Sequence, residues 1–248
     1  MKYLLPLVAI LLPCHSFAAD PVPPNVAGTW AQLQVQTSIA TIPVAGDVVS
    51  KTVAILRVEI VQNSKRLKIH STPCHVEVDS EIDMVRTVVP AAMIDAIGTQ
   101  EFRARLTHGD KGWTFYQPPV MQTLGVVLSD AWREKMPTDA DDPRVIDADA
   151  DGKPGVTVRI EGVIDGAIYV AQRSWSRLEG IVTNGRIKGS LTWQTEQSVL
   201  DATSIMLSQS PRTRPSVMPK ANYFRAIQVD PRATCEDILK LPRDQFEF

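Results

Sequence analysis

Residues 156–198, VTVRIEGVIDGAIYVAQRSWSRLEGIVTNGRIKGSLTWQTEQS, decide the fold class. Apolar and polar residues alternate through much of this stretch, and a period of two is typical of β-strands that present one face to a core. Glycines and Asn-Gly or Asp-Gly pairs interrupt the alternation, as they do at tight turns. We therefore predict strands near 156–161, 164–173, 177–183 and 186–198, with turns at Gly162, Asp165-Gly166, Gly180 and Asn184-Gly185.

Similar strand patterns occur elsewhere in the chain, and helical signals are few. The apolar run 53–61 changes phase near Leu56, which indicates a β-bulge. Pro90 to Ile97 has the composition of a short helix, and a last helix is expected to begin at Cys235. We predict an all-β fold, a single large antiparallel barrel or sandwich with short helical inserts, over residues 28–248.

The N-terminus has the pattern of a secretory signal peptide over residues 1–18. Lys2 supplies the positive start, Leu4 to Leu12 form the apolar centre, and Ser16-Phe17-Ala18 offers small residues before a cleavage site. An extended leader is expected at 19–27. No later stretch reaches the 18 apolar residues of a membrane-spanning helix. We therefore predict an exported protein, periplasmic or extracellular.

The cysteines agree with export. Cys14 leaves with the signal peptide, so Cys74 and Cys235 remain, and two cysteines in an oxidising compartment favour one disulfide over two free thiols. The bridge would close a loop of about 160 residues, which the chain-entropy model values at about 5 kcal/mol. A bridge of that length places both halves of the chain in one domain.

Charge is nearly balanced overall but uneven along the chain. The formal net charge is −2, and no basic stripe suggests a nucleic-acid partner. Within the Pro- and Asp-rich loop 137–155, six aspartates fall between Asp139 and Asp151 against the single cation Arg144. Carboxylates crowded in this way repel one another unless a cation or solvent relieves them.

The chemical motif of this loop is Asp147-x-Asp149-x-Asp151-Gly152. Carboxylates at alternate positions can aim three oxygens at one point, and the glycine permits the sharp turn that closes an oxygen cage for Ca²⁺. The alternative is a solvated acidic turn without a metal. Further oxygens could come from Asp139, Asp141 or Asp142, from the Lys153 carbonyl, or from Glu161.

The motif resembles the calcium loops of thrombospondin type 3 repeats, dockerins and, most closely, the FG-GAP repeats of integrin-like propellers, where a strand follows directly. The run 153–158 is also similar to one in uncharacterised secreted bacterial proteins. The resemblance covers about a dozen residues and implies Ca²⁺ binding but no activity. Gly155 replaces the usual ninth-position Asp, and Val158 replaces the bidentate Glu of an EF-hand. We therefore expect a dissociation constant of about 10⁻⁴–10⁻³ M.

A second resemblance concerns Gly28-Thr29-Trp30, which is similar to the G-x-W opening of lipocalin-like barrels. That resemblance implies a barrel whose tryptophan closes the base and a carrier of a small apolar ligand. Any core tryptophan of a β fold explains the motif equally well. A possible binding surface on neighbouring strands comprises Tyr169, Arg173, Trp175 and Arg177.

No catalytic constellation emerges from the sequence. There is no G-x-S-x-G nucleophile elbow, and the many Asp and Glu residues do not select a pair for a hydrolase of envelope polymers. The leading hypothesis is an exported, Ca²⁺-stabilised β protein with a structural or binding role. The lipocalin-like carrier and the hydrolase remain as alternatives.

Overall fold

The computed structural model describes residues 21–42, 46–81, 85–209, 212–218 and 220–248, so the predicted signal peptide lies outside it. In chain order its elements are β1 (Gly28–Ile42), β2 (Gly46–Asn63), β3 (Arg66–Ser80), β4 (Val85–Val88), α1 (Ala91–Ile97), β5 (Gln100–Gly109), β6 (Gly112–Leu124), β7 (Val156–Gly162), β8 (Gly166–Thr183), β9 (Arg186–Ala202), the 3₁₀ turn η1 (Ile205–Leu207), β10 (Arg212–Pro215), β11 (Tyr223–Gln228), α2 (Cys235–Leu239) and η2 (Arg243–Phe246). Helices of the described part are all too short or too polar to cross a membrane.

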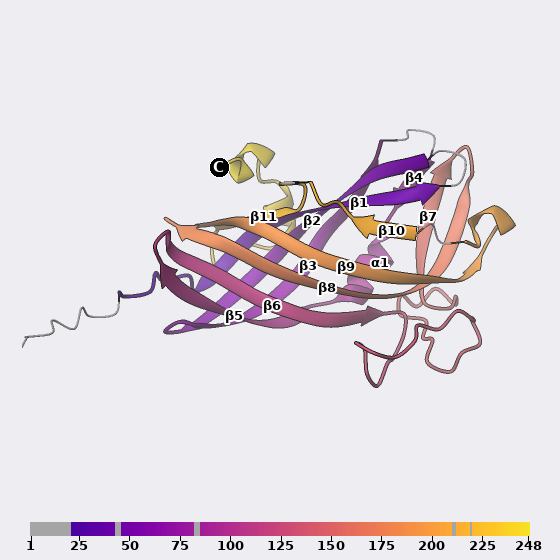
Figure 1. Ribbon diagram of the computed structural model, residues 1–248, viewed down its shortest axis with the longest axis horizontal. Coiled ribbons are helices and arrows are strands. Elements are labelled where there is room, and N and C mark those ends of the chain that lie inside the picture. The colour runs from indigo at the N-terminus through magenta and orange to yellow at the C-terminus, as the bar shows by residue number, and fades with distance from the viewer. Residues whose placement is uncertain (1–20, 43–45, 82–84, 210–211, 219) are drawn as a thin grey trace, which may run out of the picture.

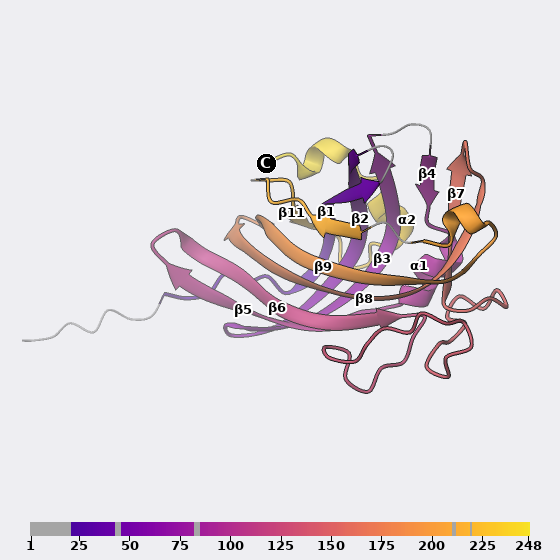
Figure 2. The ribbon, with the colours of Figure 1, turned by 45° about the vertical axis from the view of Figure 1, so that its right-hand side comes forward.

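The fold is all-β, and its antiparallel sheet closes on itself. Within the described chain, eight strands pair in the order β8, β6, β5, β3, β2, β1, β11, β9, and β9 pairs again with β8. This ring is a barrel, which decides between the two architectures that the sequence allowed (Figure 1). Strands β7 and β4 extend from the first part of β8 at one end of the molecule (Figure 2).

Apolar side chains fill one end of the barrel. Trp30, Leu106, Phe115, Leu178 and Phe224 belong to this core and are each at most 4% exposed. The indole N–H of Trp30 donates a hydrogen bond of 2.9 Å to the Val26 carbonyl, so the polar atom of the ring is satisfied where water is excluded. Gly28-Thr29-Trp30 thus opens β1 and contributes its tryptophan to the base of the barrel.

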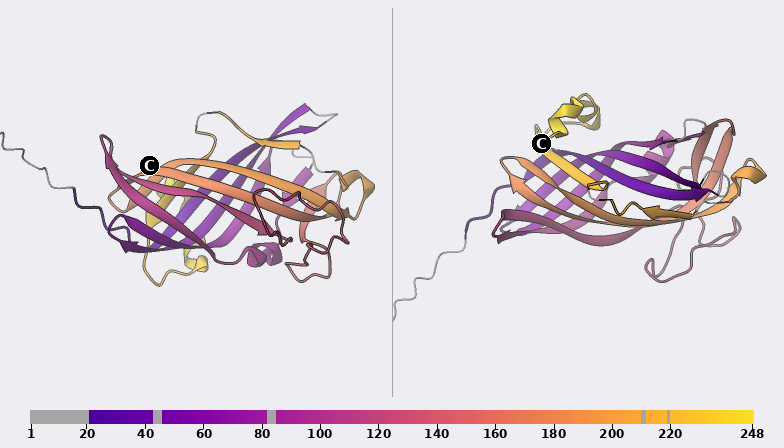
Figure 3. Two further views of the ribbon diagram at one scale, coloured as in Figure 1. Left: turned by 60° about the horizontal axis from the view of Figure 1, so that its bottom comes forward. Right: turned by 45° about the horizontal axis from the view of Figure 1, so that its top comes forward.

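The outer face of β1 is also apolar, because the C-terminal segment (residues 229–248) covers it (Figure 3). Leu33 and Val35 pack there with Ile238 of α2 and Phe246 of η2. The glutamines that alternate with them on β1 therefore point into the barrel rather than into solvent. The usual pattern, with apolar residues inside and polar residues outside, is thus reversed here, and this part of the barrel interior is polar.

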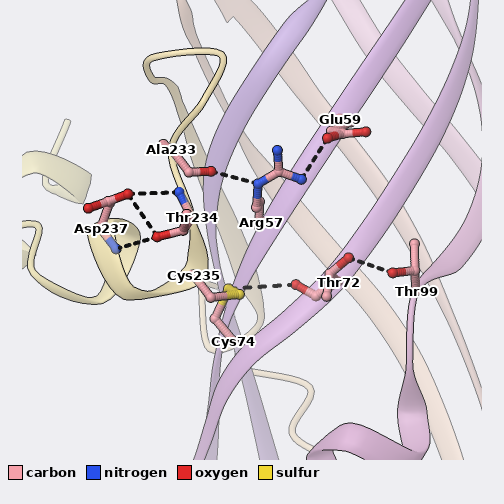
Figure 4. The surroundings of a disulfide bond; sticks show 9 residues. All are labelled: Arg57, Glu59, Thr72, Cys74, Thr99, Ala233, Thr234, Cys235 and Asp237. Carbon is pink, nitrogen blue, oxygen red and sulfur yellow. Dashed lines mark hydrogen bonds and ion pairs between the residues drawn. A yellow bond between two sulfur atoms is a disulfide. The ribbon is translucent and has the colours of Figure 1, made fainter.

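A disulfide between Cys74 and Cys235 attaches the C-terminal segment to β3, as predicted (Figure 4). The two Cα atoms lie 5.2 Å apart across a sequence separation of 161. The side chain of Arg57 adds a second tie, because its Nε–H donates to the Ala233 carbonyl at 2.7 Å. Thr234 and Asp237 form a capping box that begins α2 at Cys235.

Most local predictions are confirmed, and one is wrong. The register of β2 and β3 shifts between Ile55 and Leu56, where the bulge was expected, and both helices lie where predicted. The expected turn at Gly180 does not exist, because β8 runs without interruption from 166 to 183. Gly180 instead faces Gly189 on β9, and a Cβ at Gly180 would lie 2.5 Å from the Lys188 carbonyl oxygen. The glycine allows two strands to approach closely.

Candidate metal centre and barrel cavity

The Asp-rich loop connects β6 to β7, and backbone bonds fix both of its ends. The N–H of Ala148 donates to the Gly155 carbonyl at 2.9 Å, and the N–H of Gly155 donates to the Ile146 carbonyl at 3.0 Å. A Cβ at Gly155 would overlap the Val170 carbonyl of β8, so only glycine permits this approach. This contact explains why position nine of the motif carries no ligand side chain.

The structure brings Asp147, Asp149 and Asp151 together. One carboxylate oxygen from each lies within 4.8 Å of the others. Two oxygens bound to the same Ca²⁺ at about 2.4 Å can be at most about 4.8 Å apart, so the spacing fits a shared ion of that size. Exposed carboxylates also gather without a metal, and the spacing alone does not identify a site.

Hydrogen bonds within the loop orient two of these carboxylates. The oxygens of Asp147 accept the N–H groups of Asp151 at 3.2 Å and Gly152 at 2.8 Å, and Asp151 Oδ1 accepts the Lys153 N–H at 2.9 Å. The turn requires positive φ at Ala150 (57°) and Gly152 (80°). A carboxylate oxygen has two lone pairs, so each of these atoms can accept an N–H and still face a cation.

Asp149 differs from its neighbours in having one unpaired oxygen. Its Oδ2 accepts the backbone N–H of Thr157 at 2.8 Å, whereas its Oδ1 is shielded from solvent and has no hydrogen-bond partner. Buried polar atoms nearly always have a partner, and a carboxylate oxygen without one is costly. This orphaned atom belongs to the central ligand of the motif, which is where a cation would compensate it.

Thr157 is a site residue that sequence reasoning missed. Besides the bond to Asp149, its hydroxyl donates to Asp151 Oδ2, so one residue of β7 holds two of the three aspartates. The available signal was the position directly after the loop, where the first residues of β7 must meet the acidic turn. The loop is thus attached to the sheet through β7.

Asp142, a predicted further ligand, is engaged elsewhere. Its carboxylate accepts two bonds from the guanidinium of Arg144, at 2.9 and 2.7 Å, and a third from the Arg144 backbone N–H. These bonds hold the pKa of Asp142 at about 2, below its ordinary 3.8. Arg144 also approaches Glu134 at 3.5 Å. Arg144, the single cation between Asp139 and Asp151, therefore neutralises acids beside the cluster rather than within it.

The other acidic candidates, Asp139, Asp141 and Glu161, do not belong to the cluster of three aspartates either. The N–H of Lys153 contributes to the loop, and its amine lies 5.5 Å from the ring centre of Tyr169. Glu161 forms an ion pair with Arg86 at 3.0 Å. The described chain thus assembles three side-chain ligands, and other oxygens would have to come from backbone or water.

The possible binding surface is only partly a surface. Tyr169, Arg173, Trp175 and Arg177 all lie on β8, not on neighbouring strands as expected. Tyr169 is 8% exposed and lies beside the Asp loop, away from the others. Arg173 and Trp175 line a shallow groove on the outside of the barrel, together with Met121, Trp132, Gln194 and Glu196.

Arg173 is occupied by structural bonds. Its Nε–H and one terminal amine donate to Glu196 Oε2 at 2.9 and 2.5 Å, and the other terminal amine donates to the carbonyls of Ala131 and Glu134. It therefore fixes the segment after β6 onto the barrel wall. Arg177 contacts Thr192 Oγ1 at 3.3 Å across the β8–β9 pair.

The barrel also contains a cavity, as the lipocalin-like alternative requires, although that resemblance implies an apolar ligand. Its volume is about 210 Å³, and it lies above the apolar core, with Val58, Ile69 and Phe102 belonging to both. Apolar atoms contribute the larger part of its surface, but 12 of its 21 lining residues are polar: Gln32, Gln34, Gln36, Gln100, Gln117, Gln122, Gln172, Thr52, Ser71, Ser174, Ser176 and Thr195.

A scan against models of protein families and a search of curated proteins find no match to this chain. The acidic loop and the cavity are the features of the described chain that bear on its function.

Proposed function

We propose that this chain is an exported protein whose barrel is stabilised by one Ca²⁺ ion, held by Asp147, Asp149 and Asp151. The observation that carries the proposal is the buried, partnerless Oδ1 of Asp149. It is supported by the 4.8 Å grouping of the three carboxylates and by the excess of negative charge in the same segment. Hard cations with flexible coordination prefer such oxygen ligands.

The ion would fasten the long β6–β7 connection to the sheet. Asp149 and Asp151 are both bonded to Thr157 at the start of β7, and β7 pairs with β8. When bound, the ion supplies positive charge that removes the repulsion among the three aspartates. Its role is therefore structural, and the cost of the acidic turn falls when calcium is present.

Export is part of the same proposal. The signal-peptide pattern of residues 1–18 and the Cys74–Cys235 disulfide both favour an oxidising compartment. A site with three protein carboxylates and no bidentate Glu should bind with a dissociation constant of about 10⁻⁴–10⁻³ M, typical of extracellular modules. Such affinity suffices only where calcium is plentiful.

Calorimetric titration of the mature protein with CaCl₂ tests the proposal. We expect one site, and Asp149→Asn should weaken it by at least about tenfold, because the substitution keeps the shape of the ligand and removes its charge. The control is Asp141→Asn, which removes a charge from the same segment but lies outside the cluster. No heat with millimolar Ca²⁺, or equal binding by Asp149→Asn, would overturn the proposal.

Thermal unfolding provides an independent measurement of the same binding. At ~10 mM Ca²⁺, a site of that affinity adds about 1.4–2.7 kcal/mol to the stability of the folded state. For a chain of this size, that corresponds to a melting temperature higher by about 3–10 °C. With a tenfold weaker site, the stabilisation by Ca²⁺ should be smaller by about 1 kcal/mol in Asp149→Asn, whereas it should remain at the wild-type level in Asp141→Asn.

The cavity supports a second candidate function, a carrier of a small ligand held inside the barrel. The closed ring of strands and the buried Trp30 agree with what the G-x-W opening implies. The wall of the cavity is rich in amides and hydroxyls, which does not suit the purely apolar ligand expected from that resemblance. For the hydrolase alternative we find no such support, because the described residues that line the cavity include no carboxylate.

A further inference from the structure

The glutamines of the chain are concentrated in the barrel cavity. Seven of the 13 glutamines line it, from β1, β5, β6 and β8, together with five serine or threonine residues. None of the described lining residues carries a formal charge. The floor is different, because Val58, Ile69 and Phe102 close it with apolar surface.

Two of these amides belong to buried residues and make no hydrogen bond within the protein, although their polar atoms are still open to the space of the cavity. Gln32 is 8% exposed and Gln117 is 5% exposed, and neither side chain has a hydrogen-bond partner among the described residues. By contrast, Gln122 donates to Gln100 Oε1 at 2.9 Å, and Gln100 donates to the Ile97 carbonyl. The paired amides hold one side of the wall in place, while the unpaired amides keep their donors and acceptors for whatever fills the cavity.

The chemistry of the wall restricts the occupant. A charged ligand would lose its hydration without gaining a counter-charge, which is costly in a barrel interior. An apolar ligand would displace the water that satisfies the amides and leave them unpaired. A neutral molecule whose groups both donate and accept hydrogen bonds avoids both costs, because each amide offers two donors and an acceptor.

The volume restricts it further. A cavity of about 210 Å³ holds about seven water molecules at ~30 Å³ each, which is close to the size of one sugar ring or a short polyol. A pyranose also has an apolar C–H face, which Phe102 at the floor can contact, and hydroxyls around its rim. We infer that the barrel binds a small, neutral, hydroxyl-rich ligand of monosaccharide size. This inference rests on the carrier function proposed above and is independent of calcium.

Amide resonances provide the test. The mature protein, labelled with ¹⁵N, is titrated with glucose, galactose and mannitol, and the side-chain NH₂ signals of Gln32 and Gln117 are followed by NMR. Glucuronate and glucosamine serve as charged analogues of the same ring, and N-phenyl-1-naphthylamine serves as an apolar probe. We expect at least one of the neutral probes, glucose, galactose or mannitol, to shift the NH₂ signals of both glutamines until they saturate. The charged analogues should bind at least about tenfold more weakly.

Variants locate the binding. Replacing Gln32 and Gln117 by leucine keeps their bulk and removes their amides, so affinity for the neutral ligand should fall by roughly two- to tenfold for each. Gln194→Leu is the matched control, because Gln194 lies on the outer face of β9. Far-ultraviolet circular dichroism confirms that each variant is folded.

The outcomes separate this inference from the carrier function. Binding of N-phenyl-1-naphthylamine in the barrel without binding of neutral sugars or mannitol overturns the inference and leaves a carrier of apolar ligands. Equal binding of glucuronate or glucosamine, or binding unaffected by the two leucine substitutions, also overturns the inference. No shift with any probe overturns the inference and the carrier function together.

Discussion

Loss of the Cys74–Cys235 disulfide should lower the free energy of unfolding without changing the fold. The bridge spans 161 residues, and in the chain-entropy model a loop of that length contributes about 5 kcal/mol by restricting the unfolded chain. In the folded protein, packing also attaches the C-terminal segment to the barrel, because its residues Ile238 and Phe246 are at most 4% exposed. The cost should therefore arise almost entirely in the unfolded state.

Guanidinium unfolding of the Cys74→Ser, Cys235→Ser double variant measures this loss. We expect a decrease of about 3–5 kcal/mol and a larger denaturant slope, because an unfolded chain without the bridge exposes more surface. Wild-type protein treated with a reductant is the chemical control and should behave as the variant does. A change below about 1 kcal/mol, with native circular dichroism, would refute the entropic reasoning.

Two further predictions concern the acidic loop. Arg144 lowers the folded pKa of Asp142 to about 2 from 3.8, so the stability from this pair is complete above pH 3.8 and is lost as the pH falls towards 2. An NMR titration midpoint near 3.8 for Asp142 would contradict this. Gly155→Ala should destabilise by more than about 2 kcal/mol in thermal unfolding, because φ is +82° and the new Cβ overlaps Val170. The matched change Gly152→Ala, at φ +80° in open space, should cost only about 1–2 kcal/mol, and equal losses would refute the packing argument.

Local features of the fold could be predicted because short-range sterics determine them. The change of phase near Leu56 predicted a bulge, and Asn184-Gly185 predicted a hairpin turn, which lies between β8 and β9. Gly180 was wrongly predicted to be in a turn, because glycine occurs both in turns and where two strands approach closely. Only the partner strand, which carries Gly189, distinguishes the two cases.

Features that depend on contacts between distant parts of the chain could not be predicted from local sequence patterns. Closure of the barrel depends on β9 pairing with both β8 and β11, and no local pattern reports that. The alternation along β1 separates Leu33 and Val35 from the glutamines, but it does not determine which of the two faces lies inside the barrel. That assignment depends on the C-terminal segment, which covers the outer face from about 200 residues away in sequence.

In the candidate sites too, local features could be predicted from the sequence and long-range features could not. The convergence of Asp147, Asp149 and Asp151 follows from their alternate spacing and the glycine after them. The capture of Asp142 by Arg144 was not foreseen, because any nearby carboxylate satisfied the sequence criterion. The lipocalin-like alternative implied a cavity, but its polar lining was not foreseen, because a polar strand face is ordinarily a solvated face.

The central claim is that a cation compensates the three converging aspartates, and a crystal structure grown in 10 mM CaCl₂ tests it most directly. We predict a bound ion at about 2.3–2.6 Å from an oxygen of Asp147, Asp149 and Asp151, with Asp149 Oδ1 among its ligands. A well-ordered loop at saturating calcium that has no ion, and in which Asp149 Oδ1 is hydrogen-bonded to protein or water instead, would contradict the account.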